Sequence, residues 1–312
     1  MPGKGGPGWP ATPDLLRRAE LAVTRRVHGL REGDHLALLT GHGVEAAEAR
    51  LYAPGDDVRR IDWTVTARTA VPHVRDAIAE RELDVLALVD LSGSLDFGTA
   101  GRRKRDLGLT VLAGLGALAC RGHDRFGAVL LTGEGIRSVP ARAGRTQLAS
   151  LLTRAEAIPA EGASDLREGL ERLELVARRR GLVIVISDFL GPFTWERAMA
   201  RLARRHDTLA IELVDPREVR FPDVGFLTLV DAESGRRRTV DTGRPEIRAA
   251  YAAQARRRAA AVAEALRRAG ATHLRLMTDQ DWVGPLVRIL DQQRRARAVG
   301  HHPGQAAPGA IR

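Results

Sequence analysis

The sequence contains a single cysteine, Cys120, and aromatic residues make up only 4% of it. One cysteine excludes a disulfide within the chain and favours a reducing compartment. The scarcity of aromatic side chains leaves few platforms on which single-stranded nucleic acid could stack. The net charge of +10 comes mostly from arginines interleaved with glutamates along helical segments. This pattern indicates a solvated helix face, so we expect no nucleic-acid partner.

Long apolar segments are also missing. We find no run of about 18 apolar residues, and the N-terminus lacks the apolar segment of a signal peptide. We therefore expect no membrane insertion and a cytoplasmic location. The signatures of several enzyme classes are missing as well: a Walker A sequence, a G-x-G-x-x-G after the first strand and a G-x-S-x-G. These absences argue against ATP hydrolysis by this chain, a dinucleotide site and a serine hydrolase.

Apolar strand-like runs alternate with amphipathic helix-like runs from residue 83 onward. This alternation predicts an α/β fold, with a mostly parallel sheet covered by helices on both faces. We predict, in chain order, a disordered tail (1–12), an N-terminal helix and a small β-rich segment (13–80), the α/β domain (83–298) with a hairpin insertion near 224–241, and a second disordered tail (299–312).

The first strand-like run of the α/β domain ends on Asp90, and Ser92 and Ser94 follow at alternate positions. In a tight loop these oxygens can converge on one point, which suits a hard cation such as Mg²⁺. A later strand-like run ends on Asp188, whose carboxylate reaches the same ion if the two strands are neighbours where the strand order reverses. The alternative is that Asp90 caps the next helix and the serines bind local backbone. The second strand-terminal aspartate favours the metal.

This arrangement resembles the metal-ion-dependent adhesion site of von Willebrand factor type A domains. In those domains D-x-S-x-S is followed by a threonine before a helix, and then by an aspartate that ends a later strand. The corresponding residues here are Asp90, Ser92, Ser94, Ser164 in the threonine position, and Asp188. Thr146, one helix earlier, is the competing candidate for the threonine position. The resemblance implies a bound Mg²⁺ or Mn²⁺ whose open position takes a glutamate or aspartate from a partner protein.

A longer motif, RLYAPGDDVRRIDWTVTAR at residues 50–68, resembles the hallmark of the domain of unknown function 58 family. The resemblance runs from about residue 35 to 290 and places the chain near the shorter soluble members of that family. It implies a von Willebrand factor A-like fold. It also implies a MoxR-type AAA+ ATPase as partner, in the assembly or activation of other protein complexes.

The same motif has a local physical interpretation. Pro54-Gly55 suits a type II turn, and we expect an ion-pair network among the charged residues, with Trp63 as a buried apolar anchor. The charged residues are Asp56, Asp57, Arg59 and Asp62. On this interpretation the motif docks the small β segment on the main domain; a partner-binding role is the alternative.

The position of Asp90 also suggests an enzymatic alternative. Haloacid-dehalogenase-type phosphatases also place an aspartate after the first strand and bind Mg²⁺, but they need D-x-D, and position 92 is serine. We therefore expect a protein-interaction module rather than an enzyme, with a Mg-dependent phosphatase-like hydrolase using Asp90 as the alternative.

Overall fold

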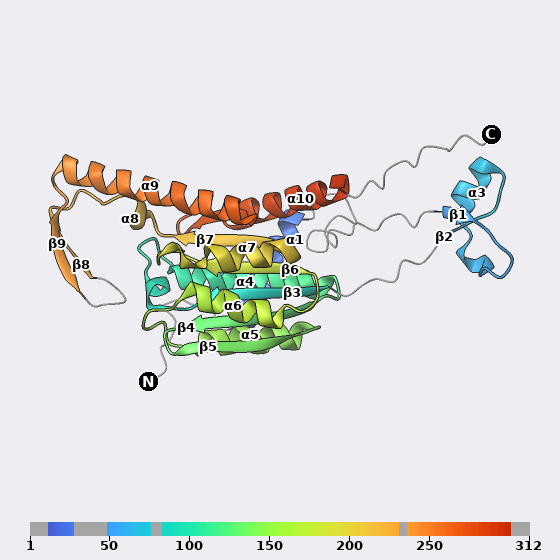
Figure 1. Ribbon diagram of the computed structural model, residues 1–312, viewed down its shortest axis with the longest axis horizontal. Helices are drawn as coiled ribbons and strands as arrows, with labels where there is room; N and C mark the ends of the chain where they lie inside the picture. The colour runs from blue at the N-terminus through green and yellow to red at the C-terminus, as the bar shows by residue number, and fades with distance from the viewer. Residues whose placement is uncertain (1–11, 28–48, 76–82, 231–235, 301–312) are drawn as a thin grey trace.

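A six-stranded β-sheet forms the centre of the computed structural model, which describes residues 12–27, 49–75, 83–230 and 236–300 (Figure 1). The strand order is β10-β7-β6-β3-β4-β5, and neighbouring strands are parallel except for the antiparallel pair β4 and β5. The strands are β3 (Asp84–Asp90), β4 (Arg125–Thr132), β5 (Gly135–Arg142), β6 (Leu182–Ser187), β7 (Asp207–Val214) and β10 (Thr272–Met277). The predicted α/β fold with a mostly parallel sheet is confirmed.

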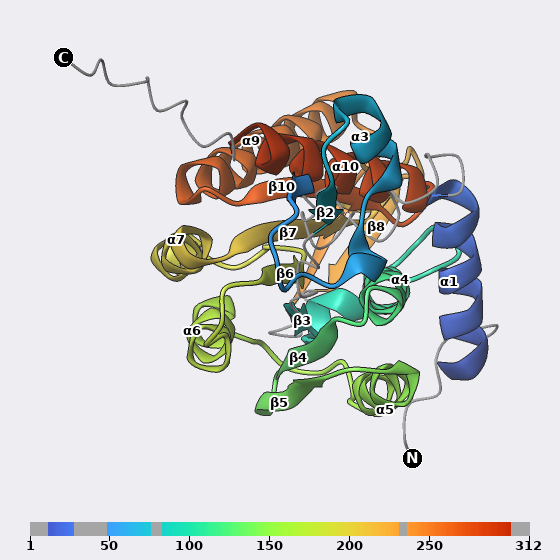
Figure 2. The same cartoon turned by 90° about the vertical axis from the view of Figure 1, so that its right-hand side faces the viewer.

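Helices cover both faces of this sheet, as the view along the strands in Figure 2 shows. One face is covered by α4 (Lys104–Arg121), α5 (Arg145–Glu156) and α10 (Val283–Gly300). The other is covered by α6 (Leu166–Val176), α7 (Glu196–Arg205) and α9 (Pro245–Ala269). Each face therefore has its own hydrophobic core.

The central strand β3 contributes to both cores. Its residues Val85, Ala87 and Val89 face the core under α4, whereas Leu86 and Leu88 face the core under α6. Successive side chains of a strand point to opposite faces of the sheet, so a strand that is covered on both sides needs apolar residues at every position. This explains why the run before Asp90 is continuously apolar.

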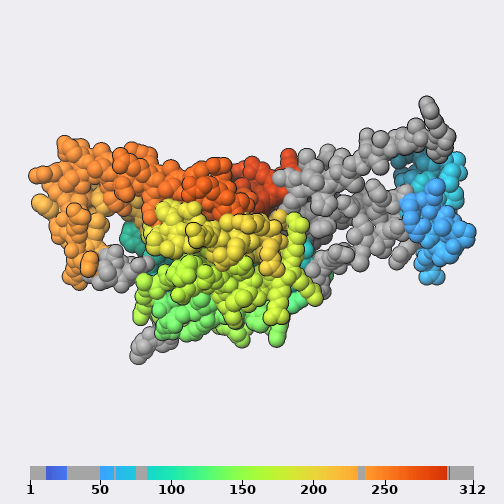
Figure 3. Space-filling model, in the orientation of Figure 1, coloured from blue at the N-terminus to red at the C-terminus, as the bar shows by residue number. Residues whose placement is uncertain are grey.

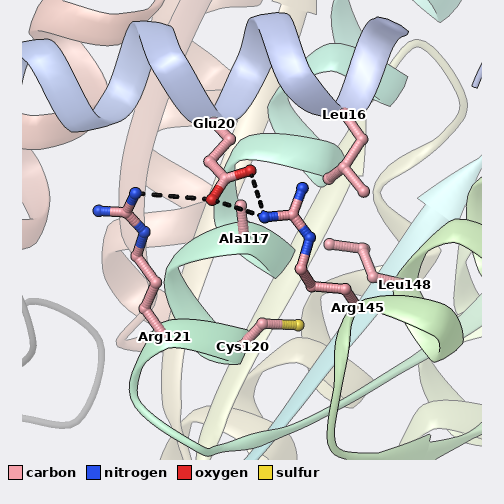
Figure 4. A pocket seen from close by; sticks show the side chains of 7 residues that line it. All are labelled: Leu16, Glu20, Ala117, Cys120, Arg121, Arg145 and Leu148. Atoms are coloured by element: carbon pink, nitrogen blue, oxygen red, sulfur yellow. Dashed lines mark hydrogen bonds and ion pairs between the residues drawn. The ribbon is translucent and has the colours of Figure 1, made fainter. Parts of the chain in front are cut away.

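The N-terminal helix α1 (Thr12–Val27) belongs to the sheet domain. Its buried residues join the core under α4: Leu15, Leu16, Ala19 and Val23. Glu20 forms ion pairs with Arg121 of α4 (3.5 Å) and Arg145 of α5 (2.8 Å), and these side chains rim a small pocket that Cys120 lines (Figure 4). The sequence pattern had grouped this helix with the β-rich segment, but its apolar stripe packs on α4 instead.

Residues 49–75 form a small unit of their own. The strand β1 (Ala49–Leu51) pairs antiparallel with β2 (His73–Arg75), and η1 (Val58–Arg60) and α3 (Trp63–Thr69) lie between them in the chain. Arg50 binds Asp56 through two contacts of 2.6 Å. Asp57 caps η1 and Asp62 caps α3. Two of the acids that we expected in an ion-pair network thus serve as helix caps.

The expectation that Trp63 is a buried anchor is wrong. Its side chain is 71% exposed, and α3, the helix that it begins, has no buried residue of its own. Figure 1 draws this unit apart from the sheet, and the segments that join the two lie outside the described residues. The expected docking of the motif through Trp63 is therefore not seen in the part of the chain that the structure describes.

A hairpin of β8 (Phe226–Val230) and β9 (Arg237–Asp241) follows the short helix α8 (Pro216–Val219), over the range where the sequence suggests an insertion. Figures 1 and 3 show it standing out from the body at the end of α9. Most of the connection between its two strands, and nearly all of the two expected tails, lie outside the described residues. Across the described ranges, no helix combines the length and apolarity needed to span a bilayer.

Candidate functional site

The carboxyl ends of β3 and β6 meet at the centre of the sheet. The two strands are hydrogen-bonded neighbours, with Val89 opposite Ile186. The chain leaves β3 toward β4 and β5, and then returns to the other side of β3 with β6. Such a reversal of strand order leaves a crevice beyond the strand ends, where ligands bind in open α/β sheets. Asp90 and Asp188 both lie at this position.

Asp90 is buried and is held by uncharged donors. Its Oδ1 accepts hydrogen bonds from the Ser92 amide (3.0 Å) and the Ser164 hydroxyl (3.3 Å), and its Oδ2 accepts one from the Ser187 hydroxyl (2.8 Å). Burial raises the pKa of Asp90, and the nearby negative charge of Asp188 raises it further. The carboxylate is thus fixed in orientation but little compensated in charge.

Ser92 and Ser94 lie beside Asp90 at the start of η2 (Gly93–Asp96). Both are buried, and their hydroxyl oxygens are 3.3 Å apart. The Gly93 amide donates to the carbonyl of Gly162 (2.9 Å), which ties this turn to the loop that carries Ser164. The structure therefore brings together at one edge of the sheet the serines and aspartates that the sequence singled out.

Thr146, the competing candidate, lies elsewhere. The strand β5 runs antiparallel to β4, so it leads the chain away from the carboxyl edge before α5 begins. Thr146 is exposed in the first turn of that helix. Of the two candidates for the threonine position, only Ser164 contacts Asp90.

Sequence reasoning missed Lys104, the first residue of α4. Its side chain is fully buried, and its Nζ lies 2.7 Å from Oδ2 of Asp188 and 2.6 Å from Oε1 of Glu218. Burial alone would lower the pKa of Lys104, but the two carboxylates raise it above its ordinary value. A lysine three residues before the apolar run LGLTVLAGLGALA was the available signal, although nothing in the sequence identified its partners.

Glu218 is itself held in place by the turn after β7. Its Oε2 accepts a hydrogen bond from the Asp215 amide (2.9 Å), and Asp215 in turn caps α8. Asp215 is fully buried and also accepts from the amide and hydroxyl of Thr99, in the loop after η2. This chain of contacts fixes the distance between α8 and the start of α4, and so the position of Lys104.

The donors at this edge fit a hard divalent cation. Asp90, Ser92 and Ser94 offer oxygen atoms only, and the cation would relieve the repulsion between Asp90 and Asp188. No cluster of three or more His, Cys, Asp or Glu side chains suited to a metal occurs in the described ranges, so a cation here needs serine hydroxyls as ligands. A cation site does not explain Lys104, because its ammonium group already neutralises the negative charge of Asp188.

Exposed large apolar side chains lie on the segments that leave this edge. Phe97 follows η2 and is 41% exposed, and Leu190 follows Asp188 and is 44% exposed. The hairpin leaves from the same edge, since α8 follows β7 directly, and it carries Phe226, which is 79% exposed. Exposed apolar groups around a polar centre are typical of surfaces that bind another protein.

The chain has close relatives in mycobacteria. It is 46% identical over 292 residues to the uncharacterized protein Rv1480 of Mycobacterium tuberculosis, covering 92% of this chain and 91% of the relative. It is 41% identical over 168 residues to the uncharacterized protein MAV169 of Mycobacterium avium, covering 52% of this chain and 97% of the relative.

Solved structures resemble the fold at low sequence identity. The protein BatB from Bacteroides thetaiotaomicron shares 11% identity with a TM-score of 0.44, over 68% of this chain and 99% of that one. The VWA domain of SpRpn10 shares 10% identity with a TM-score of 0.39, over 68% of this chain and 95% of that one. At these identities the likeness concerns the fold alone.

The expected cytoplasmic location is contradicted by solved structures of similar fold that come from membrane proteins. One is named an aerotolerance-related membrane protein from Bacteroides fragilis, with 12% identity and a TM-score of 0.43 over 69% of this chain and 99% of that one. The expectation had rested on missing apolar segments, and it is withdrawn.

The N-terminal motif and the sheet domain fall within one family. The model of the family described as "Protein of unknown function DUF58" matches residues 48–261, from the small unit of β1 and β2 through the candidate site and into α9. This match spans well over half of the chain. It includes every strand of the central sheet except β10. The chain belongs to the DUF58 family.

Proposed function

We propose that this chain is a metal-dependent protein–protein interaction module. The residues that would hold Mg²⁺ or Mn²⁺ are Asp90, Ser92, Ser94, Ser164 and Asp188. The observation that carries the proposal is the convergence of a buried, poorly compensated carboxylate with serine hydroxyls at the carboxyl edge of the sheet. The ion would supply a Lewis-acidic position for a glutamate or aspartate of the partner protein.

The residues of this chain prepare that contact. Ser187 and the Ser92 amide orient Asp90, so its carboxylate needs no rearrangement to receive a cation. Phe97 and Leu190 exclude water once a partner surface closes over the edge. A charge-assisted contact shielded in this way is worth roughly 2 kcal/mol or more at a protein interface.

The partner that the family resemblance suggests is a MoxR-type AAA+ ATPase. In this proposal the ATPase supplies the energy of ATP hydrolysis, and the present chain supplies recognition, in the assembly or activation of a protein complex. The chain itself acts without catalysis.

A pull-down with the tagged chain tests this function. We expect a partner to bind in Mg²⁺ or Mn²⁺ and to be lost in EDTA, with Ca²⁺ a poor substitute because it prefers more ligands at longer distances. Ser92→Ala and Ser164→Ala should weaken binding. Thr146→Ala and Arg257→Ala, at exposed positions away from the site, should leave it unchanged.

The partner side of the contact can be tested in the same assay. Converting one essential Glu or Asp of the partner to Gln or Asn should have the effect of EDTA. Binding that is equal in EDTA would remove the metal-dependent mechanism. Mg²⁺-dependent turnover of a generic phosphate ester, lost in Asp90→Asn, would instead support the hydrolase.

A further inference from the structure

Lys104 places its ammonium group inside the candidate site. Its ammonium group lies between two carboxylates, at 2.7 Å from Asp188 and 2.6 Å from Glu218, and its side chain is fully buried. Leu190 donates its amide to the other oxygen of Asp188 (3.1 Å), so both oxygens of that carboxylate have a partner within the chain. A cation that used Asp188 would have to share it with Lys104.

We propose that Lys104 and Glu218 form an internal counter-ion pair that competes with the divalent cation for Asp188 and thereby sets how tightly the site holds its metal. This inference rests on the proposed function, because it concerns the same ion. It assigns a regulatory role to two residues that are not themselves ligands in that proposal.

The charges explain why Lys104 and Glu218 would weaken the binding of the metal. With Lys104 on Asp188, Asp90 is the one charged residue left among the five proposed ligands to neutralise a divalent ion, because the serine hydroxyls are neutral donors. Two positive charges confined in a buried site repel one another strongly. The ion is therefore held loosely by the chain alone and keeps more of its positive charge for the partner's carboxylate. Metal and partner then bind cooperatively, each raising the affinity for the other.

Glu218 provides the second position for the lysine. It is anchored through the Asp215 amide, and its side chain is 22% exposed, whereas that of Asp188 is 4% exposed. When a cation approaches Asp188, the Lys104 ammonium can keep its bond to Glu218 while its bond to Asp188 lengthens. The lysine then remains paired, and no buried charge is left without a partner.

Mn²⁺ binding to purified variants tests this inference, measured by calorimetry and by the electron paramagnetic resonance signal of free Mn²⁺. The double variant Lys104→Met/Glu218→Gln removes one positive and one negative charge, so the local net charge is unchanged while Asp188 is released. We expect its Kd for Mn²⁺ to fall by about tenfold or more, which corresponds to about 1.4 kcal/mol. Arg103→Met is the control for the loss of a nearby positive charge, because Arg103 pairs with Asp96 and Asp106 and not with Asp188.

The single variant Glu218→Gln guards against a double variant that fails to fold. It leaves the bond between Lys104 and Asp188 in place and removes the alternative position of the lysine, so Mn²⁺ binding should become several-fold weaker. A melting temperature without metal, measured for each variant, separates this effect from a loss of stability.

The outcomes separate the two proposals. Tighter binding in the double variant, or weaker binding in Glu218→Gln, with little change in Arg103→Met supports the competing pair. A Kd that stays the same in folded variants overturns this inference and leaves the metal site standing. Failure of every variant, the wild type included, to bind Mn²⁺ overturns the metal site and this inference with it.

Discussion

Asp90 and Asp188 lie at neighbouring strand ends but have different surroundings. Asp188 has a buried lysine against its carboxylate, whereas the donors described for Asp90 are uncharged: a backbone amide and serine hydroxyls. A buried carboxylate without a compensating charge is unfavourable, because burial penalises its ionised form. The cost is concentrated at one of the residues that would hold the divalent cation.

Asp90→Asn should therefore stabilise the metal-free protein. The change removes a buried negative charge and its repulsion with Asp188, while the amide oxygen can still accept from Ser92. We expect the free energy of unfolding at neutral pH to rise by about 1 kcal/mol, measured by urea denaturation in EDTA. A loss of similar size would show that the ionised carboxylate is structurally required.

A second buried residue, His206 at the end of α7, should make the stability of the folded protein depend on pH. Burial lowers the pKa of His206, and the neighbouring charge of Arg205 lowers it further. In the unfolded chain this histidine takes up a proton below a pH of about 6.5, whereas the folded protein resists it. Stability is therefore lost as the pH falls below that value, until the pH passes below the folded pKa.

Urea denaturation at pH of about 7.5 and about 5.5 measures this loss. In His206→Asn the loss should be smaller than in the wild type, because asparagine does not titrate. An identical loss in both proteins would mean that other groups account for the acid sensitivity. The effect of Asp90→Asn and the effect of His206 protonation each depend on a single buried group.

At the scale of elements, α1 is attached to the domain by an apolar stripe and by the ion pairs of Glu20. These pairs rim the pocket in which Cys120 lies (Figure 4). Burial raises the pKa of the Cys120 thiol, so little thiolate is present at neutral pH. The reactivity of this thiol consequently reports how closely α1 covers α4 and α5.

Glu20→Ala should raise the rate at which a disulfide reagent labels Cys120 by a few-fold. The change frees one end of the ion pairs and removes a negative charge that keeps the pKa of the thiol high. Stability should change by about 1 kcal/mol or less, since the arginines are substantially exposed. Glu174→Ala, which breaks a comparable pair with Arg201 on the opposite face, is the control and should leave labelling unchanged.

The helix α3 carries Trp63 on an exposed position, where an apolar side chain has little to stabilise. Trp63→Ala should change the free energy of unfolding by no more than about 0.5 kcal/mol. A buried tryptophan would cost about 3–5 kcal/mol. Lost partner binding at an unchanged melting temperature would assign the motif to an interaction surface, whereas a large drop in melting temperature would restore the structural interpretation.

At the scale of the whole molecule, the candidate site joins β3, η2, β6 and the loop before α6, between the two hydrophobic cores. These elements must all be folded for the site to exist, so metal binding stabilises the whole domain by mass action. We expect the melting temperature to rise with Mn²⁺ concentration. The gain should be about 2.7 kcal/mol at a concentration one hundred times the Kd. Asp90→Asn should abolish the rise, and a flat response in the wild type would contradict metal binding.

Much of the fold could be predicted from the sequence because it depends on local pattern. The apolar run ending on Asp90 marks a strand buried on both faces, and the alternation of strands and helices specifies a parallel sheet. A parallel sheet brings its carboxyl ends to one edge, so Asp90 and Asp188 could be assigned to the same place before any contact was known. The family motif at residues 50–68 was likewise readable from its letters alone.

Features that depend on contacts between distant residues became visible only in the folded chain. Lys104 meets Asp188 and Glu218 across 84 and 114 positions of sequence, and no local pattern encodes such a pairing. The exposure of Trp63 could not be predicted for the same reason, because the identity of an apolar residue does not tell whether another segment of the chain covers it. Periodicity is a property of one segment, whereas burial and ion pairing depend on which segments come together.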